Sequence, residues 1–254
     1  MRLSRAFRPG ERSPRLVETE PGDRRELWTE AVGELPPVYG ERWTEAAERR
    51  YRLFEPGRSK LAAAIVRGWS GDLPAPGERW LYLGAASGTT ASHVADLVGP
   101  EGRVYAVERS VRPFARLVAL AERWPNLRPI LADAREPLEY AGLVPPADGL
   151  YADIAQPDQL EIVVRNAELL LSGVGGRLLV ALKTPSMGRG RSAVAHRAGF
   201  ESTLADVAAL APSVSLEPFH KGHFMVGGRW GRSASLPARE RSRPTPPRAR
   251  RRAR

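Results

Sequence analysis

Short apolar segments alternate with amphipathic ones along the middle of the chain. After Ser59, apolar residues recur every four positions at Leu61, Ile65 and Trp69, which predicts a helix that Ser59 caps and that ends near Gly71. By the same reasoning we expect helices at 90–97, 111–122 and 159–171, and strands at 79–83, 103–107, 129–131, 149–152 and 177–182. The stretches 214–218 and 224–227 are expected to form a final antiparallel pair. Apolar strands that alternate with helices indicate an α/β fold on a parallel sheet covered on both faces.

The two ends of the chain differ in composition from this middle part. Residues 1–55 are rich in Pro, Gly and charge and predict a small β-containing N-terminal module with a disordered start. Residues 232–254 are rich in Pro, Ser and Arg and predict a disordered tail, because such a segment cannot bury enough apolar surface to fold. We therefore expect an N-terminal module at 1–55, an α/β domain at 56–231 and a tail at 232–254.

The net charge of +10 over 254 residues is concentrated at the C-terminal end. Residues 238–254 contain eight Arg and one Glu, a net of +7, which leaves +3 for residues 1–237. Two interpretations of this segment remain open. It is a solvated tail without a binding role, or it holds nucleic-acid phosphates without sequence preference through counterion release.

The sequence contains no cysteine and no long apolar run. Without cysteine the chain has no disulfide, no thiolate nucleophile and no Cys-ligated zinc. Its four His are scattered without ligand spacing, so we expect no metal. There is no run of 18 apolar residues to cross a membrane, and no apolar region follows the basic N-terminus as in a secretory signal. We expect a cytoplasmic protein without a membrane partner.

A glycine-rich turn, GAASGTT (84–90), follows the first strand of the predicted sheet and opens a helix. It lacks the Lys of a P-loop and the middle Gly of the dinucleotide fingerprint, while small residues such as Gly84 let a ligand approach the backbone. Acidic residues follow the next three strands at Glu108, Asp133 and Asp153. Glu108 is placed to accept both hydroxyls of a ribose, and Asp133 to accept from an adenine amino group. An adenosine ligand without a pyrophosphate fits best, and the common one is S-adenosylmethionine (SAM).

Three basic side chains complete the candidate chemistry. Lys60 lies on the helix before the sheet, Lys183 ends an apolar strand and His223 begins the last strand. Each of them taken alone is typical of a surface or strand-end position. Because ligands bind beyond the carboxyl ends of parallel strands, we expect these three to gather with Asp153 at one edge of the sheet.

Six blocks of sequence resemble the fibrillarin family and together span about residues 38–230. Four of them are LYLGAASGTTASHVADLVGPEGRVYAVERS (81–110), ADAREP (132–137), YADIAQPDQ (151–159) and EPFHKGH (217–223). Two further blocks, VYGERW (38–43) and GRSKLAAAIVRG (57–68), resemble the archaeal branch. The resemblance implies a Rossmann-like, seven-stranded SAM-dependent methyltransferase fold behind the small N-terminal module.

The resemblance also implies roles for individual residues. The implied catalytic set is Lys60, Asp153, Lys183 and His223. The implied SAM contacts are Thr89, Thr90, Glu108, Arg109, Asp133, Ala134, Asp153, Ile154, Ala155 and Gln156. In this set Asp153 would orient the ribose hydroxyl, Lys183 would remove or stabilise its proton, and the other two would tune that pair and hold the substrate. Which residue takes the proton is left open.

By the same resemblance, we expect methylation of ribose 2′-hydroxyls of rRNA, with tRNA as a further target. The implied partners are a box C/D guide RNA, a Nop-domain scaffold protein and a kink-turn-binding ribosomal-type protein. One alternative is a non-catalytic RNA-binding or assembly protein that keeps the SAM fold. Another is a guide-independent methyltransferase acting on RNA or protein. The presence of all four catalytic residues favours an enzyme.

Three features depart from the family pattern. An acidic residue usually precedes the histidine equivalent to His223, where this chain has Gly222. After Lys183 the chain continues with TPSMGRGR (184–191) rather than with Ala and a polar loop. The Arg-rich end is unusual for the archaeal branch, and eukaryotic members carry a Gly/Arg-rich region at the N-terminus instead. The first two departures put in question the support of His223 and the shape of the RNA-facing loop.

Overall fold

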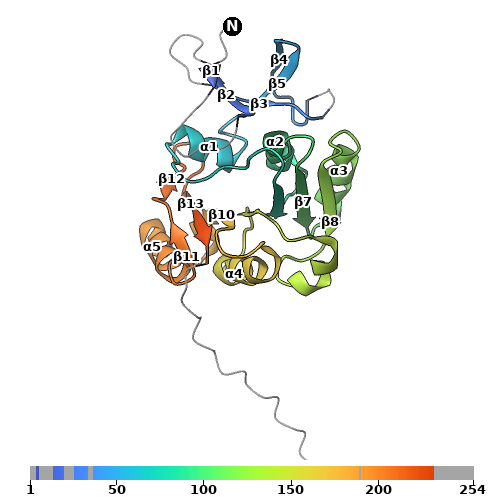
Figure 1. Cartoon of the computed structure of the whole chain (residues 1–254). Helices are drawn as coiled ribbons and strands as arrows, with labels where there is room; N and C mark the ends of the chain where they lie inside the picture. Colours follow the sequence, from blue (N-terminus) through green and yellow to red (C-terminus); the bar gives the residue numbers. More distant parts are fainter. Residues whose placement is uncertain are drawn as a thin grey trace, which may run out of the picture.

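The computed structural model describes residues 4–5, 14–19, 26–33, 37–188, 190 and 192–231. The predicted tail at 232–254 and most of the predicted disordered start lie outside these residues. The described residues form a small N-terminal sheet and a large mixed sheet flanked by helices (Figure 1).

The large sheet has the strand order β11-β13-β10-β9-β6-β7-β8, and β12 pairs with β13 as its eighth strand. The strands are β6 (Arg79–Leu83), β7 (Arg103–Glu108), β8 (Leu127–Leu131), β9 (Gly149–Ala152), β10 (Arg177–Lys183), β11 (Ala208–Leu210), β12 (Val214–Ser215) and β13 (His223–Trp230). Strands β6 to β10 run parallel, whereas β13 runs antiparallel between β10 and β11. The predicted α/β fold and its parallel sheet are thereby confirmed.

Alternating side chains of each central strand pack against different helices. Trp80 and Tyr82 of β6 share a core with α1 (Lys60–Val66), α2 (Thr89–Val98) and α3 (Val111–Ala121). Leu81 and Leu83 of the same strand share the opposite core with α4 (Gln159–Leu170) and α5 (Ala193–Leu204). Because both faces are buried, the strands are apolar throughout rather than alternating in polarity. Three short 3₁₀ helices complete the fold: η1 (Pro137–Glu139), η2 (Ala141–Leu143) and η3 (Thr184–Ser186).

The N-terminal residues form an antiparallel sheet, which confirms the predicted β content of this module. Its strands are β1 (Ser4–Arg5), β2 (Leu16–Thr19), β3 (Glu26–Glu30), β4 (Trp43–Ala46) and β5 (Arg49–Leu53), in the order β1-β2-β3-β5-β4. This sheet lies beside α1 and α2 (Figure 1), and Leu16 and Leu27 enter the same core as those helices. The division at residue 55 stays a prediction.

Some element boundaries differ from the predicted ones. Helix α1 ends at Val66 rather than near Gly71, because Gly68 takes a left-handed φ of 94° that turns the chain out of the helix. Trp69 is still buried in the core beyond the helix end. Helix α5 and strand β11 were not predicted. Of the twelve residues in α5, Phe200 and Leu204 are the buried ones, so its apolar period is too weak to recognise.

Candidate active site

A cleft of about 400 Å³ lies at the carboxyl ends of β6, β7, β8 and β9. Its volume is in the range of pockets that hold small ligands. It is lined by most of the residues predicted to contact a cofactor, together with Lys183: Gly84, Glu108, Arg109, Asp133, Ala134, Asp153, Ile154, Ala155 and Gln156. The remaining two, Thr89 and Thr90, lie in the first turn of α2 outside this lining, and Thr90 donates to Ser59 Oγ at 3.0 Å.

Gly84 allows the turn after β6 to lie against the end of β9. It takes a φ of 79°, and a Cβ at this position would stand 2.7 Å from the carbonyl oxygen of Asp153. A larger residue would therefore push the two strand ends apart. The glycine at this position is required by the backbone that forms the floor of the cleft.

Glu108 ends β7 and fixes the same turn from the other side. Its Oε2 accepts from the Ala86 N–H at 2.9 Å, and its Oε1 accepts from the Ser110 N–H at 2.7 Å. The residue is 7% exposed. A carboxylate has about four acceptor sites, so two remain for hydroxyl groups of a ligand.

Asp133, beyond the end of β8, is held by two guanidinium groups. Arg135 Nη2 donates to its Oδ2 at 2.6 Å, and Arg109 Nη1 lies 3.5 Å from the same oxygen. The hydrogen bonds from Arg135, with the charges of both Arg, lower the pKa of Asp133 to about 2. The carboxylate is therefore ionised at neutral pH and acts only as an acceptor toward the cleft.

Asp153, Lys60 and Lys183 form one ion-pair cluster at the mouth of the cleft. Lys60 Nζ lies 3.0 Å from Asp153 Oδ1, and Lys183 Nζ lies 2.8 Å from the same atom. Lys183 Nζ also donates to the Asp153 carbonyl oxygen at 2.9 Å. Three residues separated by 93 and 30 positions thus converge, Asp153 and Lys183 from neighbouring strand ends and Lys60 from the start of α1.

Gln159 fixes the strand end that carries Lys183, and the sequence did not predict this interaction. Its Nε2 donates to the Lys183 carbonyl at 3.2 Å, and its Oε1 accepts from the Lys183 N–H at 3.1 Å. Gln159 is fully buried at the start of α4. It closes the YADIAQPDQ block, so membership in that block is the signal that points to it.

His223 stands directly opposite Lys183 in the antiparallel ladder of β10 and β13. Its Nδ1–H donates to the Lys221 carbonyl at 2.8 Å, and the ring centroid of His220 lies 6.0 Å away. Burial, with the positive charges of Lys60 and Lys183, lowers the pKa of His223 below 6.5. The imidazole is therefore neutral at neutral pH and keeps its lone pair on Nε2.

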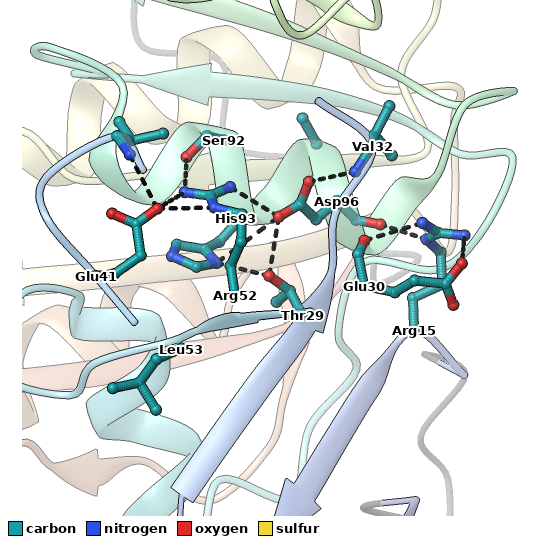
Figure 2. A network of polar contacts seen from close by, with 12 residues as sticks. Arg15, Thr29, Glu30, Val32, Glu41, Arg52, Leu53, Ser92, His93 and Asp96 are labelled. Carbon is teal, nitrogen blue, oxygen red and sulfur yellow. Dashed lines mark hydrogen bonds and ion pairs between the residues drawn. The ribbon is translucent and has the colours of Figure 1, made fainter. Parts of the chain in front are cut away.

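The N-terminal sheet is tied to α2 by a buried polar network that periodicity does not reveal (Figure 2). Arg52 Nη1 donates to Asp96 Oδ2 at 2.8 Å and its Nη2 lies 2.7 Å from Glu41 Oε1. All three side chains are at most 1% exposed. Thr29 Oγ1 lies 2.7 Å from His93 Nδ1 and donates to Asp96 Oδ2 at 2.9 Å. Because Gly88 of the glycine turn caps α2, the network holds the helix that follows this turn.

The side chains that line the cleft fit an adenosine ligand. Within the described ranges, no group of three or more His, Asp or Glu has the arrangement of a metal site. The two free acceptor positions of Glu108 match a ribose diol, and the ionised Asp133 matches an amino donor. Gly84 lines the cleft together with these two residues. None of the described helices is long and apolar enough to cross a membrane.

Comparison with known proteins agrees with this geometry. A family model described as Fibrillarin matches residues 12–232. The chain is 41% identical over 186 residues to a fibrillarin-like rRNA/tRNA 2′-O-methyltransferase of Pyrococcus horikoshii, covering 73% of this chain and 82% of that protein. It is 40% identical to the rRNA 2′-O-methyltransferase fibrillarin of Eremothecium gossypii, covering 82% of this chain and 67% of that protein.

Three solved structures share the fold. Methanococcus jannaschii fibrillarin has a TM-score of 0.84 at 34% identity, covering 91% of this chain and 97% of that one. Aeropyrum pernix fibrillarin with natively bound S-adenosyl-L-methionine has a TM-score of 0.78 at 39% identity, covering 89% and 97%. A fibrillarin/Nop5p complex has a TM-score of 0.73 at 36% identity, covering 81% and 94%. The Rossmann-like methyltransferase fold expected from the sequence is confirmed, and the unpredicted β11 is an eighth strand beside the predicted seven.

Proposed function

The chain belongs to the fibrillarin family, and from that premise we propose that it is a SAM-dependent methyltransferase acting on ribose 2′-hydroxyls of rRNA. One observation carries the proposal. The Asp153 carboxylate, which closes the parallel strand β9, is held by both Lys60 and Lys183 beside a cleft lined by Glu108 and Asp133. A protein that only bound RNA would have no need of this cluster.

The residues of the cleft would orient the cofactor rather than activate it. SAM supplies a methyl group that is already activated on a positively charged sulfur. Glu108 would hold the ribose hydroxyls through its free acceptor positions, and Asp133 would accept from the adenine amino group. The difficulty of the reaction lies in the substrate hydroxyl, a weak nucleophile, so in-line positioning of the two reactants supplies much of the acceleration.

Asp153 would orient the attacking hydroxyl. Its carboxylate accepts a hydrogen bond from the 2′-OH, and the two lysines fix the direction of that carboxylate through bonds of 2.8 and 3.0 Å. In the transfer the ribose oxygen would take the methyl group, the sulfur would leave as an uncharged thioether, and the hydroxyl proton would pass to the Asp153 carboxylate. The ammonium groups of Lys60 and Lys183 stabilise the negative charge that develops on the ribose oxygen.

His223 would act beside this cluster as a neutral hydrogen-bond acceptor. Its lowered pKa keeps the ring uncharged next to two ammonium groups. The Nε2 lone pair can accept a hydrogen bond from the substrate ribose, while the bond from Nδ1 to the Lys221 carbonyl fixes the ring orientation. We assign His223 a substrate-holding role on this basis.

We further propose that the chain works inside a guided ribonucleoprotein, with a box C/D guide RNA, a Nop-domain scaffold protein and a kink-turn-binding protein. The support is the similarity to the chain solved in a fibrillarin/Nop5p complex. The modest charge of +3 on residues 1–237 agrees with a complex in which the guide supplies most of the affinity for the target. The tRNA target rests on the name of the Pyrococcus relative, an rRNA/tRNA methyltransferase.

The test is methyl transfer in the reconstituted complex. The full chain, guide RNA, scaffold and kink-turn-binding protein are mixed with SAM carrying a radioactive methyl group and a target RNA. We expect one methyl group at the guided nucleotide and none on a matched target with 2′-deoxyribose at that nucleotide. Transfer to neither RNA would contradict the proposed activity. Equal transfer by the chain without its partners would show that the enzyme acts without a guide RNA.

A further inference from the structure

A second hollow, of about 510 Å³, lies where the first turn of α2, helix α3 and the stretch 38–39 meet. Three arginines line it, Arg58, Arg116 and Arg123, together with the hydroxyl residues Ser87 and Thr89. No carboxylate belongs to this lining within the part of the chain that the structure describes. We call it the Arg58–Arg116 hollow.

Two guanidinium groups of the hollow lie over aromatic rings. The Cζ of Arg58 lies 5.6 Å from the ring centroid of Tyr39, and that of Arg123 lies 5.4 Å from that of Trp124. The attraction between a guanidinium and a ring restricts the position of the guanidinium and leaves its N–H groups able to bond a ligand. The aromatic rings therefore preorganise these cations.

Arg58 and Arg116 are both exposed, and among the described residues neither forms an ion pair with a carboxylate. Some other exposed arginines are paired: Arg49 lies 2.8 Å from Glu30, and Arg165 lies 2.6 Å from Glu161. The positive charge of Arg58 and Arg116 is thus not balanced by the described part of the protein. An external anion is the group that would balance it.

The cationic surface continues from the hollow to the SAM cleft. Arg112 and Arg116 are four residues apart on α3 and therefore lie on the same face of that helix. Arg109, just before α3, lines the cleft itself. One chain segment thus presents arginines to both sites.

The hollow is also next to the proposed transfer centre. Arg58 stands two residues before Lys60, which contacts Asp153. Ser59, between them, caps α1 and accepts a hydrogen bond from Thr90 in the first turn of α2. A phosphate at Arg58 and the ribose that reacts at Asp153 can therefore belong to one RNA strand, because phosphates link successive nucleotides of that strand.

We propose that the Arg58–Arg116 hollow binds a backbone phosphodiester of the substrate RNA strand near the target nucleotide. Guanidinium groups and hydroxyls match phosphate oxygens in charge and in hydrogen-bonding geometry. Such a contact reads no base and instead sets the register of the strand relative to Asp153. The proposal rests on the proposed function and names a substrate contact for it.

The experiment compares two double variants of the full chain with equal changes of charge. The test variant is Arg58→Gln with Arg116→Gln. The matched control is Arg67→Gln with Arg128→Gln, two exposed arginines that donate to backbone carbonyls outside the hollow. The probe is a short fluorescein-labelled single-stranded RNA, and its affinity is measured by anisotropy over a range of salt concentrations.

We expect the test variant to bind this RNA about 2- to 30-fold more weakly than the control, the scale of two exposed ion pairs. Its slope of log affinity against log salt should flatten by about 0.7 for each phosphate that the variant no longer neutralises. Equal affinities and slopes in the two double variants would overturn the proposal. So would unchanged RNA affinity with weakened binding of the scaffold protein, which would make the hollow a protein interface.

Two further measurements distinguish RNA binding by the hollow from cofactor binding by the hollow and from failure of the proposed function. SAM affinity by calorimetry should be the same in both double variants, and a decrease confined to the test variant would assign the hollow to the cofactor. In the reconstituted complex the test variant should raise KM for the target RNA with kcat little changed, because the phosphate is held equally before and during transfer. Absence of transfer by the wild-type chain would contradict the proposed function, whereas wild-type transfer with an unchanged KM in the test variant would contradict the hollow alone.

Discussion

Thr184 Oγ1 donates a 2.7 Å hydrogen bond to the carbonyl oxygen of Gly222. Thr184 follows Lys183 at the end of β10, and Gly222 precedes His223 at the start of β13, so the bond joins the backbones that carry two residues of the proposed site. Gly222 takes a φ of 68°, and a Cβ there would stand 3.2 Å from Pro185 Cγ. The two departures of this chain from the family pattern are therefore in contact, and the loop after Lys183 supports His223.

Gly222→Ala should destabilise the protein and weaken methyl transfer. A left-handed conformation costs a residue with a Cβ about 1–2 kcal/mol, and here the added methyl also presses on Pro185. The free energy of unfolding from urea titrations measures the effect. The control is Gly142→Ala, because Gly142 has open space and no left-handed φ. Equal unfolding free energies for the two variants would show that the backbone at Gly222 is not constrained.

Asp153→Asn should reduce methyl transfer by at least about 100-fold, the lower range for a group that acts on a transferring proton. The amide keeps the size of the side chain but removes the charge that Lys60 and Lys183 contact. Single-turnover transfer in the reconstituted complex measures it, with circular dichroism to show that the fold is retained. Glu161→Gln removes an exposed carboxylate from α4 and serves as the control. Wild-type rates in Asp153→Asn would exclude this carboxylate from the mechanism.

Glu108→Gln should weaken SAM binding by about 1.5–3 kcal/mol, the scale of hydrogen bonds to a charged group. Gln is preferable to Ala because its amide oxygen can still accept from one of the Ala86 and Ser110 N–H groups that Glu108 holds, whereas Ala would release both. Calorimetry gives the SAM affinity, and RNA binding should stay at the wild-type value. An unchanged SAM affinity would argue against the placement of the cofactor ribose at β7.

Arg52→Met should lower the free energy of unfolding by about 3–5 kcal/mol, because it leaves the buried carboxylates of Glu41 and Asp96 without their cation. The control is Arg50→Met on the same strand, where the side chain is exposed. Urea unfolding of both variants gives the comparison. A decrease no greater than that of the control would mean that the network in Figure 2 contributes little to stability.

Acid should destabilise the protein as the pH falls below 6.5, the ordinary pKa of histidine. Burial, aided by the Arg52 charge, lowers the pKa of His93 well below that value, so the unfolded chain binds this proton at a higher pH than the folded one. The stability is therefore present above 6.5 and is lost as the pH falls toward the folded-state pKa. His220 and His223 shift in the same direction.

His93→Gln tests the contribution of that single group. Unfolding free energies are measured for both proteins between about pH 7.5 and about pH 5.5, and the variant should show the shallower decline. Asp96, whose pKa burial raises, is present in both proteins, so the difference in slope reports His93. Parallel curves would show that His93 takes up its proton without cost to the fold.

The central α/β part of the fold could be predicted from the sequence, and so could the cleft residues at the carboxyl ends of its parallel strands. The glycine turn after β6 and the acidic residues that follow β7, β8 and β9 are local features, visible as a short apolar run with a polar residue after it. Parallel strands place their carboxyl ends at one edge, so these residues had to meet once the strands were identified. Helix α5 was missed because it buries too narrow an apolar face to produce a clear period.

Tertiary structure alone decided the contacts between distant segments. The burial of Arg52 between Glu41 and Asp96 and the hydrogen bond from Thr184 to the Gly222 carbonyl depend on how helices and sheets are placed against one another. Local periodicity reports which face of an element is buried, but it carries no information about which distant polar groups share that burial. Those partners are selected by strand register and by the cost of leaving a buried charge unpaired, and both become defined only when the whole chain has packed.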